Sequence, residues 1–226
     1  MIVRHDPGVL PSGYYCRPFG PWYCVTAERQ GSAVRRLRPV EDRLGREGIV
    51  SRFFDDPWAL CVRLARHQGH TIACAESCTG GLVSGQLTAV PGASRVCLGG
   101  VVAYDNRIKE NLLGVRSDCL ERHSAVSEEC AAQMAAGVRS LFGASLAISV
   151  TGIAGPGGAV PGKPVGTVCI GLSTEGGTVT QRFQFSGTRE SIRRYSSETA
   201  CAILVSALIG RHDAVFFGHS AESAGQ

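Results

Sequence analysis

Three short apolar runs, each followed by turn-forming or polar residues, constrain the fold more than any other feature of this sequence. They occupy residues 71–75, 96–104 and 146–150. A short apolar run between turn formers is typical of a buried strand. Segments of helical character separate the runs. Such an alternation indicates helices packed on both faces of one sheet.

The helical segments carry start signals of their own. Asp56 and Pro57 offer an acidic cap and a proline at the first helical position, ahead of apolar residues at helical spacing. A second helix is predicted to open at 77–81. The other predicted helices cover residues 106–113, 127–142 and 188–209.

Two further runs, 166–173 and 179–185, flank Glu175-Gly176-Gly177 and predict a β-hairpin. Because a hairpin closes a series that begins with strand and helix alternation, the sheet is expected to be mixed. We therefore predict an α/β fold, a three-layer α/β/α domain with a mixed sheet.

The sequence divides into three parts. Residues 1–51 hold five prolines, scattered aromatic residues and an arginine-rich run without periodicity, so we expect a poorly ordered, irregular N-terminal extension. The aromatic residues leave open that this extension packs on the domain or on a partner. Residues 52–210 are expected to form the single domain, and 211–226 a C-terminal tail.

Composition excludes several classes of function. Much of the formal charge of +4 comes from arginines before the domain, which gives no sign of a nucleic-acid-binding face. Several of the ten cysteines lie inside apolar runs, and none shows the spacing of a zinc site. We expect reduced thiols and no metal. No run is long enough to span a bilayer, so we expect a cytoplasmic protein without membrane contact.

The first candidate site follows the first strand. Ser77 and Thr79 supply hydroxyls, and Gly80 and Gly81 lead into a helix. Free amides at such a point attract a phosphate or a developing oxyanion. The alternative is that Ser77 or Thr79 only caps the helix.

A second candidate follows the second strand. Tyr104 ends it, and Asn106 and Lys109 lie in the first turn of the next helix. A lysine whose pKa is lowered by burial can deprotonate a serine, with a phenol to position it. A solvated Lys109 and a Tyr104 anchored at the sheet edge are the alternative.

The third candidate is the glycine-rich loop that begins at Thr151. It follows a central strand, where ligands of α/β sheets often bind. Gly162-Lys163 resembles part of a P-loop, but Pro164 stands where a magnesium-binding hydroxyl is required. A dinucleotide fingerprint starting at Gly155 is not completed at Val160. We therefore expect neither triphosphate hydrolysis nor hydride transfer.

The last predicted helix opens with Arg189 and Arg193, one turn apart on one face. Two such arginines can hold a phosphate. A solvated arginine pair is the alternative.

Four motifs, three of them described above, occur in an order that resembles the CinA C-terminal family, the nicotinamide-nucleotide amidohydrolases or competence/damage-inducible CinA-like proteins. The resemblance covers residues 53–208. The motifs are Glu76-Ser77-Cys78-Thr79-Gly80-Gly81, then Tyr104-Asp105-Asn106 with Lys109 and Leu113-Gly114-Val115, then Ala125-Val126-Ser127, and last Thr151-Gly152-Ile153-Ala154-Gly155-Pro156.

The resemblance implies deamidation of nicotinamide mononucleotide to nicotinic acid mononucleotide and ammonia, with no metal and no cofactor. By motif, Ser77 would be the nucleophile, Lys109 its base and Tyr104 a positioning or relay group. Members of such a family often assemble, which leaves a homo-oligomer open. The implied substrate-binding residues are Thr79, Gly80, Gly81, Asn106, Thr151, Gly152, Gly155, Arg189 and Arg193, with Arg189 or Arg193 at the phosphate.

The chain departs from the family pattern in two respects. Ser124 stands where the family commonly has a glycine, and residues 1–51 are too short for the nucleotide-processing domain of two-domain members. Two other functions stay open: a non-catalytic nucleotide-binding regulator or scaffold of the same fold, and an amidase for another substrate.

Overall fold

The computed structural model describes residues 2–3, 14–19, 22–27, 49–51 and 56–210. Its main sheet has five strands in the order β6-β5-β7-β8-β9. Strands β6, β5 and β7 are parallel, and β7, β8 and β9 are antiparallel neighbours. This mixed sheet confirms the predicted fold class. The strand bounds are β5 Ile72–Glu76, β6 Cys97–Val102, β7 Leu146–Gly152, β8 Thr167–Thr174 and β9 Gly177–Gln184.

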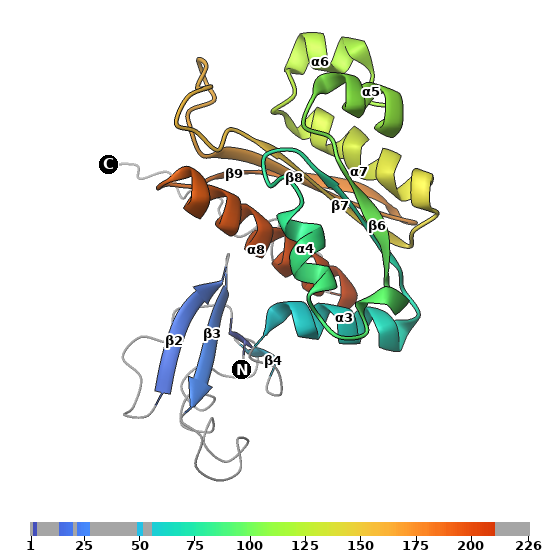
Figure 1. Cartoon of the computed structure of the whole chain (residues 1–226), viewed down its shortest axis with the longest axis vertical. Coiled ribbons are helices and arrows are strands. Elements are labelled where there is room, and N and C mark those ends of the chain that lie inside the picture. Colours follow the sequence, from blue (N-terminus) through green and yellow to red (C-terminus); the bar gives the residue numbers. More distant parts are fainter. Residues whose placement is uncertain (1, 4–13, 20–21, 28–48, 52–55, 211–226) are drawn as a thin grey trace, which may run out of the picture.

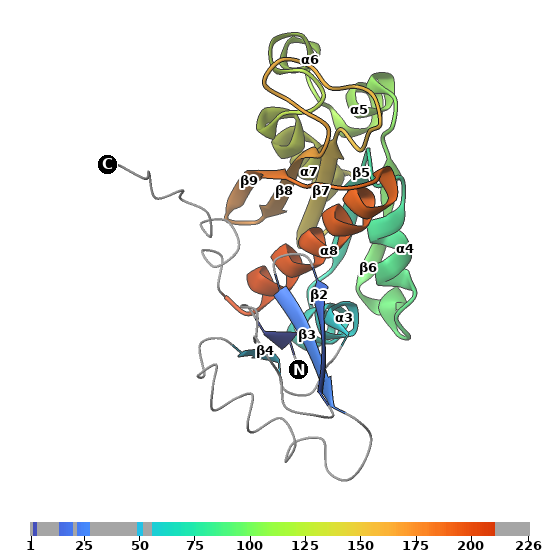
Figure 2. The ribbon, with the colours of Figure 1, turned by 90° about the vertical axis from the view of Figure 1, so that its left-hand side faces the viewer.

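Helices cover both faces of this sheet (Figures 1 and 2). The helices α3, α4 and α8 pack on one face, and α5, α6 and α7 form the other layer. Their bounds are α3 Pro57–Gln68, α4 Leu82–Thr88, α5 Asn106–Leu113, α6 Ser117–His123, α7 Glu128–Phe142 and α8 Arg189–Leu208, with a 3-10 turn η1 at Ala93–Arg95. Helix α6 was not predicted.

The side chains of β5 show how the two layers differ. Ile72 and Cys74 lie in the core with α3 and α8, whereas Ala73 and Ala75 face α7. Alternate residues of a strand point to opposite faces of the sheet. Because the face toward α7 carries only alanines, α7 can approach β5 closely. At Gly171 in β8, an added Cβ would lie only 2.7 Å from the Ala131 carbonyl of α7.

Four short strands also lie within the first 51 residues: β1 Ile2–Val3, β2 Tyr14–Phe19, β3 Trp22–Ala27 and β4 Ile49–Ser51. They pair antiparallel in the order β2-β3-β1-β4. Pro18 lies in β2, at the edge of this sheet, where a missing N–H costs no ladder bond. The rest of residues 1–51 and the tail 211–226 lie outside the described residues, so the proposed division into domains stays a prediction.

Candidate functional site

Glu76, the last residue of β5, holds the loop that carries Ser77 through its side-chain carboxylate. The Glu76 carboxylate is buried and accepts hydrogen bonds from the amides of Gly81 at 2.9 Å, Val83 at 3.0 Å and Ser84 at 2.8 Å. The Ser84 hydroxyl donates a fourth at 2.6 Å. These amides lie at the start of α4. The negative charge of Glu76 therefore offsets the positive end of the helix dipole. We expected free amides here, and the Gly81 amide is not free.

Ser77 itself lies in the turn between β5 and α4 and is half-buried. Its amide donates to the Val150 carbonyl at 2.8 Å, and its carbonyl accepts from the Gly80 amide at 3.1 Å. Within the described part of the chain, the Ser77 hydroxyl has no hydrogen-bond partner. The backbone of Ser77 is therefore held while its side chain is left available.

Lys109 occupies the first turn of α5, and only 1% of it is exposed. Its Nζ donates to the Ala103 carbonyl at 2.8 Å and to the Tyr104 carbonyl at 3.3 Å. Burial lowers the pKa of Lys109 below its usual value, against the opposing influence of Cys130 and of other nearby groups. No carboxylate of the described residues forms an ion pair with this amine.

Ser77 and Lys109 both follow the carboxyl ends of neighbouring parallel strands, β5 and β6. Glu76 and Val102 are register partners on the parallel strands β5 and β6, and the Ala103 amide donates to the Glu76 carbonyl at 2.7 Å. The serine therefore follows β5 at the level where the acceptors of Lys109 follow β6. Among the described residues no hydrogen bond joins the serine hydroxyl to the amine.

Tyr104 and Arg189 are hydrogen-bonded to each other at the same end of the sheet. Tyr104 is 61% exposed, and its hydroxyl accepts from Arg189 Nη2 at 3.0 Å. Arg189 Nη1 donates to the Gly155 carbonyl at 2.8 Å. The start of α8 thus joins the end of β6 to the loop after β7.

Arg193, one turn further along α8, contacts the Ser77 loop instead. Its Nε donates to the Cys78 carbonyl at 3.1 Å and its Nη2 to the Thr79 carbonyl at 2.8 Å. Gly80, at φ +58°, would place an added Cβ 3.4 Å from the same Nη2. Both arginines face the predicted site, but the hydrogen bonds above join them to neutral protein groups.

The remaining predicted residues differ in their surroundings. The Thr151 hydroxyl is buried and donates to the Ala125 carbonyl at 2.7 Å, which fastens the segment before α7. Gly152 leaves no room for a side chain, because an added Cβ would lie 2.7 Å from the Val168 side chain. Asn106 is exposed at the start of α5.

Two contacts of this region were missed from the sequence. One is the four-bond cap made by Glu76, although an acidic residue shortly before a helix was a usable signal. The other is Lys163, whose Nζ donates to the His123 carbonyl at 2.6 Å and to the Ser124 hydroxyl at 2.7 Å. Ser124 has φ +67°, a conformation that glycine adopts more easily.

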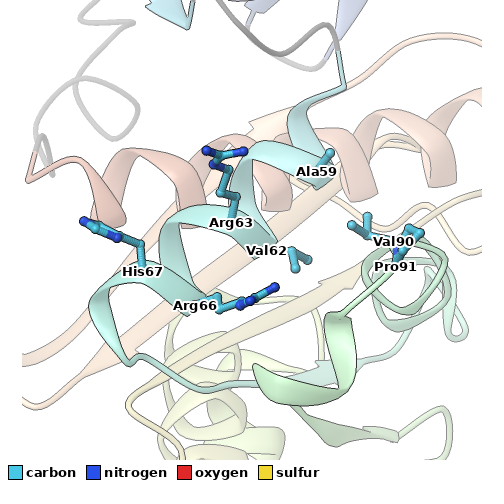
Figure 3. A pocket seen from close by; sticks show the side chains of 7 residues that line it. All are labelled: Ala59, Val62, Arg63, Arg66, His67, Val90 and Pro91. Atoms are coloured by element: carbon cyan, nitrogen blue, oxygen red, sulfur yellow. The ribbon is translucent and has the colours of Figure 1, made fainter.

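A pocket of about 700 Å³ lies elsewhere, between α3 and the segment before η1 (Figure 3). Val62, Val90 and Pro91 form its apolar part, and Arg63, Arg66 and His67 line it from α3. Another pocket, of about 680 Å³, lies between α3, α4 and α8, and Arg193 is one of its lining residues. Neither pocket is lined by Ser77 or Lys109.

Two further expectations concern a metal ion and a membrane. Among the described residues, no group of three or more His, Cys, Asp or Glu side chains is placed to hold a metal ion. None of the helices in that part of the chain has the length and apolar character needed to cross a membrane.

Comparison with known proteins identifies the family. The model of the CinA C-terminal domain matches residues 57–208. This chain belongs to that family. A CinA-like protein of Thermotoga maritima is 49% identical over 150 residues, which cover 66% of this chain and 36% of the relative. A CinA-like protein of Gemmatimonas aurantiaca is 40% identical over 179 residues, covering 79% and 42% of the two chains. The chain thus spans less than half of these CinA-like relatives.

Solved structures of the CinA superfamily match the domain over nearly their whole length. The competence damage-inducible protein A from Klebsiella pneumoniae has a TM-score of 0.66 and 37% identity, and covers 68% of this chain and 95% of its own. The competence/damage inducible protein CihA from Agrobacterium tumefaciens has a TM-score of 0.64 and 36% identity, with 70% and 98% covered. The CinA C-terminal fold is therefore shared.

Proposed function

We propose that this chain hydrolyses the carboxamide of nicotinamide mononucleotide to nicotinic acid mononucleotide and ammonia. The observation that carries the proposal is Lys109, a buried lysine held by two backbone carbonyls and with a lowered pKa. Burial favours the uncharged amine, the form a general base requires. Membership of the CinA C-terminal family supports the same chemistry, through the motifs set out above.

The hydrogen bonds of Lys109 suit a base. A neutral amine carries two hydrogens and one lone pair. The carbonyls of Ala103 and Tyr104 accept the two hydrogens, so the lone pair is left for the proton of Ser77.

In the proposed reaction, Ser77 Oγ bonds to the amide carbon while its proton passes to Lys109, and the carbonyl electrons move to the oxygen. Collapse of this intermediate expels ammonia, which takes the proton from Lys109. Water then attacks the acyl ester on Ser77 and gives its proton to Lys109. The departing Ser77 oxygen takes this proton back as nicotinic acid mononucleotide is released.

Arg189 is the better candidate for the substrate phosphate. Arg189 is exposed, and the groups that accept its hydrogen bonds, the Tyr104 hydroxyl and the Gly155 carbonyl, are neutral. Its positive charge is therefore not cancelled by them, which favours an anionic ligand.

The proposal is tested by incubating the purified full chain with nicotinamide mononucleotide and measuring ammonia together with the acid product. We expect Ser77→Ala to abolish turnover, because the variant has no nucleophile. Ser94→Ala, at an exposed serine of η1, is the matched control and should keep the wild-type rate. Ammonia release by the Ser77→Ala variant at the wild-type rate would refute the assignment.

The pH profile gives a second test. Only neutral Lys109 can accept the proton, so activity should rise with pH through its lowered pKa and fall below it. A rate that stays flat into the acid range would exclude Lys109 as the base. Calorimetry that shows the mononucleotide bound without turnover would favour a regulator, and faster turnover of a competing amide would favour another substrate.

A further inference from the structure

Arg193 determines how the backbone of the Ser77 loop is oriented. Its guanidinium is half-buried and donates to two successive carbonyls, those of Cys78 and Thr79. A single side chain that binds two neighbouring peptide units fixes the rotation of both.

The direction of the amides follows from these carbonyls. In a trans peptide the C=O and the following N–H point to opposite sides. The Cys78 carbonyl faces Arg193, so the Thr79 N–H points away from it. The Ser77 carbonyl accepts from Gly80, so the Cys78 N–H points away from the interior of the turn.

The Thr79 amide has no acceptor among the described residues, and the Cys78 amide contacts only the sulfur of its own side chain. The Thr79 hydroxyl is fully buried and also lacks a partner there. The neighbouring donors are all used: Ser77 N–H by Val150, Gly80 N–H by Ser77, Leu82 N–H by Thr79, and the amides of Gly81, Val83 and Ser84 by Glu76. The unused donors therefore belong to the turn directly after the proposed nucleophile, and are separate from the helix end.

We propose that Arg193 is a positioning residue that holds the Cys78 and Thr79 amides as an oxyanion hole for the intermediate on Ser77. This inference rests on the proposed function, because the oxyanion forms when Ser77 attacks a carbonyl. The amide that follows a nucleophilic serine supplies one such donor in other serine hydrolases. The bond from Arg193 to the Cys78 carbonyl also polarises that peptide, which makes the Thr79 N–H a stronger donor.

The inference differs from a phosphate-binding role for Arg193 in what it predicts. A phosphate contact is made in both the ground state and the transition state, so its loss raises KM. An oxyanion hole acts only as the charge develops, so its loss lowers kcat.

The experiment compares Arg193→Gln with wild type on nicotinamide mononucleotide and on nicotinamide riboside, which has no phosphate. We expect kcat to fall about 10²-fold or more on both substrates, with KM changed by less than about threefold. Arg193→Lys, which can reach one carbonyl, should recover part of the rate. Arg194→Gln is the matched control, since Arg194 is exposed and pairs with Glu198 at 3.7 Å.

A raised KM for the mononucleotide with unchanged kcat, and no effect on the riboside, would overturn the inference in favour of a phosphate clamp. Wild-type protein inactive on both substrates would refute the proposed function instead. In that case the positioning role of Arg193 is tested by crystal structures of Arg193→Gln, or of Arg193→Lys if the first variant does not fold. We expect the Cys78–Thr79 peptide to rotate, and an unchanged peptide would refute a positioning role.

Discussion

Glu76→Gln tests whether the buried carboxylate holds the Ser77 loop. One oxygen of Glu76 accepts the amides of Gly81 and Val83, and the other accepts the amide and hydroxyl of Ser84. Glutamine keeps the shape but has one acceptor oxygen. In its better orientation that oxygen keeps the first two bonds, and its NH2 group faces Ser84. The hydroxyl can turn to accept, but the amide of Ser84 cannot.

The cost can be worked from these contacts. One amide left without an acceptor costs about 1–3 kcal/mol. The two retained hydrogen bonds are weaker because their acceptor is no longer charged, but a neutral side chain is easier to bury. Together these two effects cost about 1 kcal/mol. The free energy of unfolding should therefore fall by about 2–4 kcal/mol. For a protein of this size that lowers Tm by roughly 6–12 °C.

Urea denaturation and calorimetry of the full chain measure this loss. Ser127→Ala is the control, since the Ser127 hydroxyl caps α7 by accepting the Cys130 amide at 3.1 Å and donates to the Ser124 carbonyl at 2.9 Å. Losing both bonds should cost about 1–2 kcal/mol. If Glu76→Gln costs no more than Ser127→Ala, the carboxylate does not stabilise the loop as argued.

Two other predictions concern stability. Because burial lowers the pKa of Lys109 in the folded protein, the unfolded chain binds more protons between that lowered pKa and about pH 10.4, and wild-type stability rises with pH in this window. Lys109→Met removes this dependence and leaves the Ala103 and Tyr104 carbonyls without their donor, so its loss of stability relative to wild type should grow in urea titrations toward pH 10; a loss independent of pH would contradict this. Ser124 has φ +67° and ψ 168°, a region nearly restricted to glycine, so Ser124→Gly should gain about 1 kcal/mol despite losing the bond from Lys163. Ser124→Ala keeps the strain and loses the bond, so thermal melts should rank glycine above serine and serine above alanine, and any other order would refute the strain.

Much of the fold was accessible from the sequence because its buried strands are short apolar runs with clear ends. The run predicted at 71–75 became β5, and that at 146–150 became β7. Helix α6 escaped because it has seven residues, no side-chain cap and mostly polar side chains, so it has no usable periodicity. It forms because it packs against α7 through Cys119, which only the tertiary structure provides.

The candidate site was only partly accessible, for a physical reason. Ser77 and Lys109 could be named because their side-chain chemistry is visible in the sequence. The partners of Arg189 and Arg193 could not, because most are backbone carbonyls, which every residue carries. The helical spacing of the two arginines indicated one face of a helix, but not that Arg189 would contact the loop after β7 and Arg193 the Ser77 turn. Those contacts depend on where the first turns of α8 lie relative to the ends of β5, β6 and β7. In this protein the side chains that perform the proposed chemistry are therefore easier to read from sequence than those that orient its backbone.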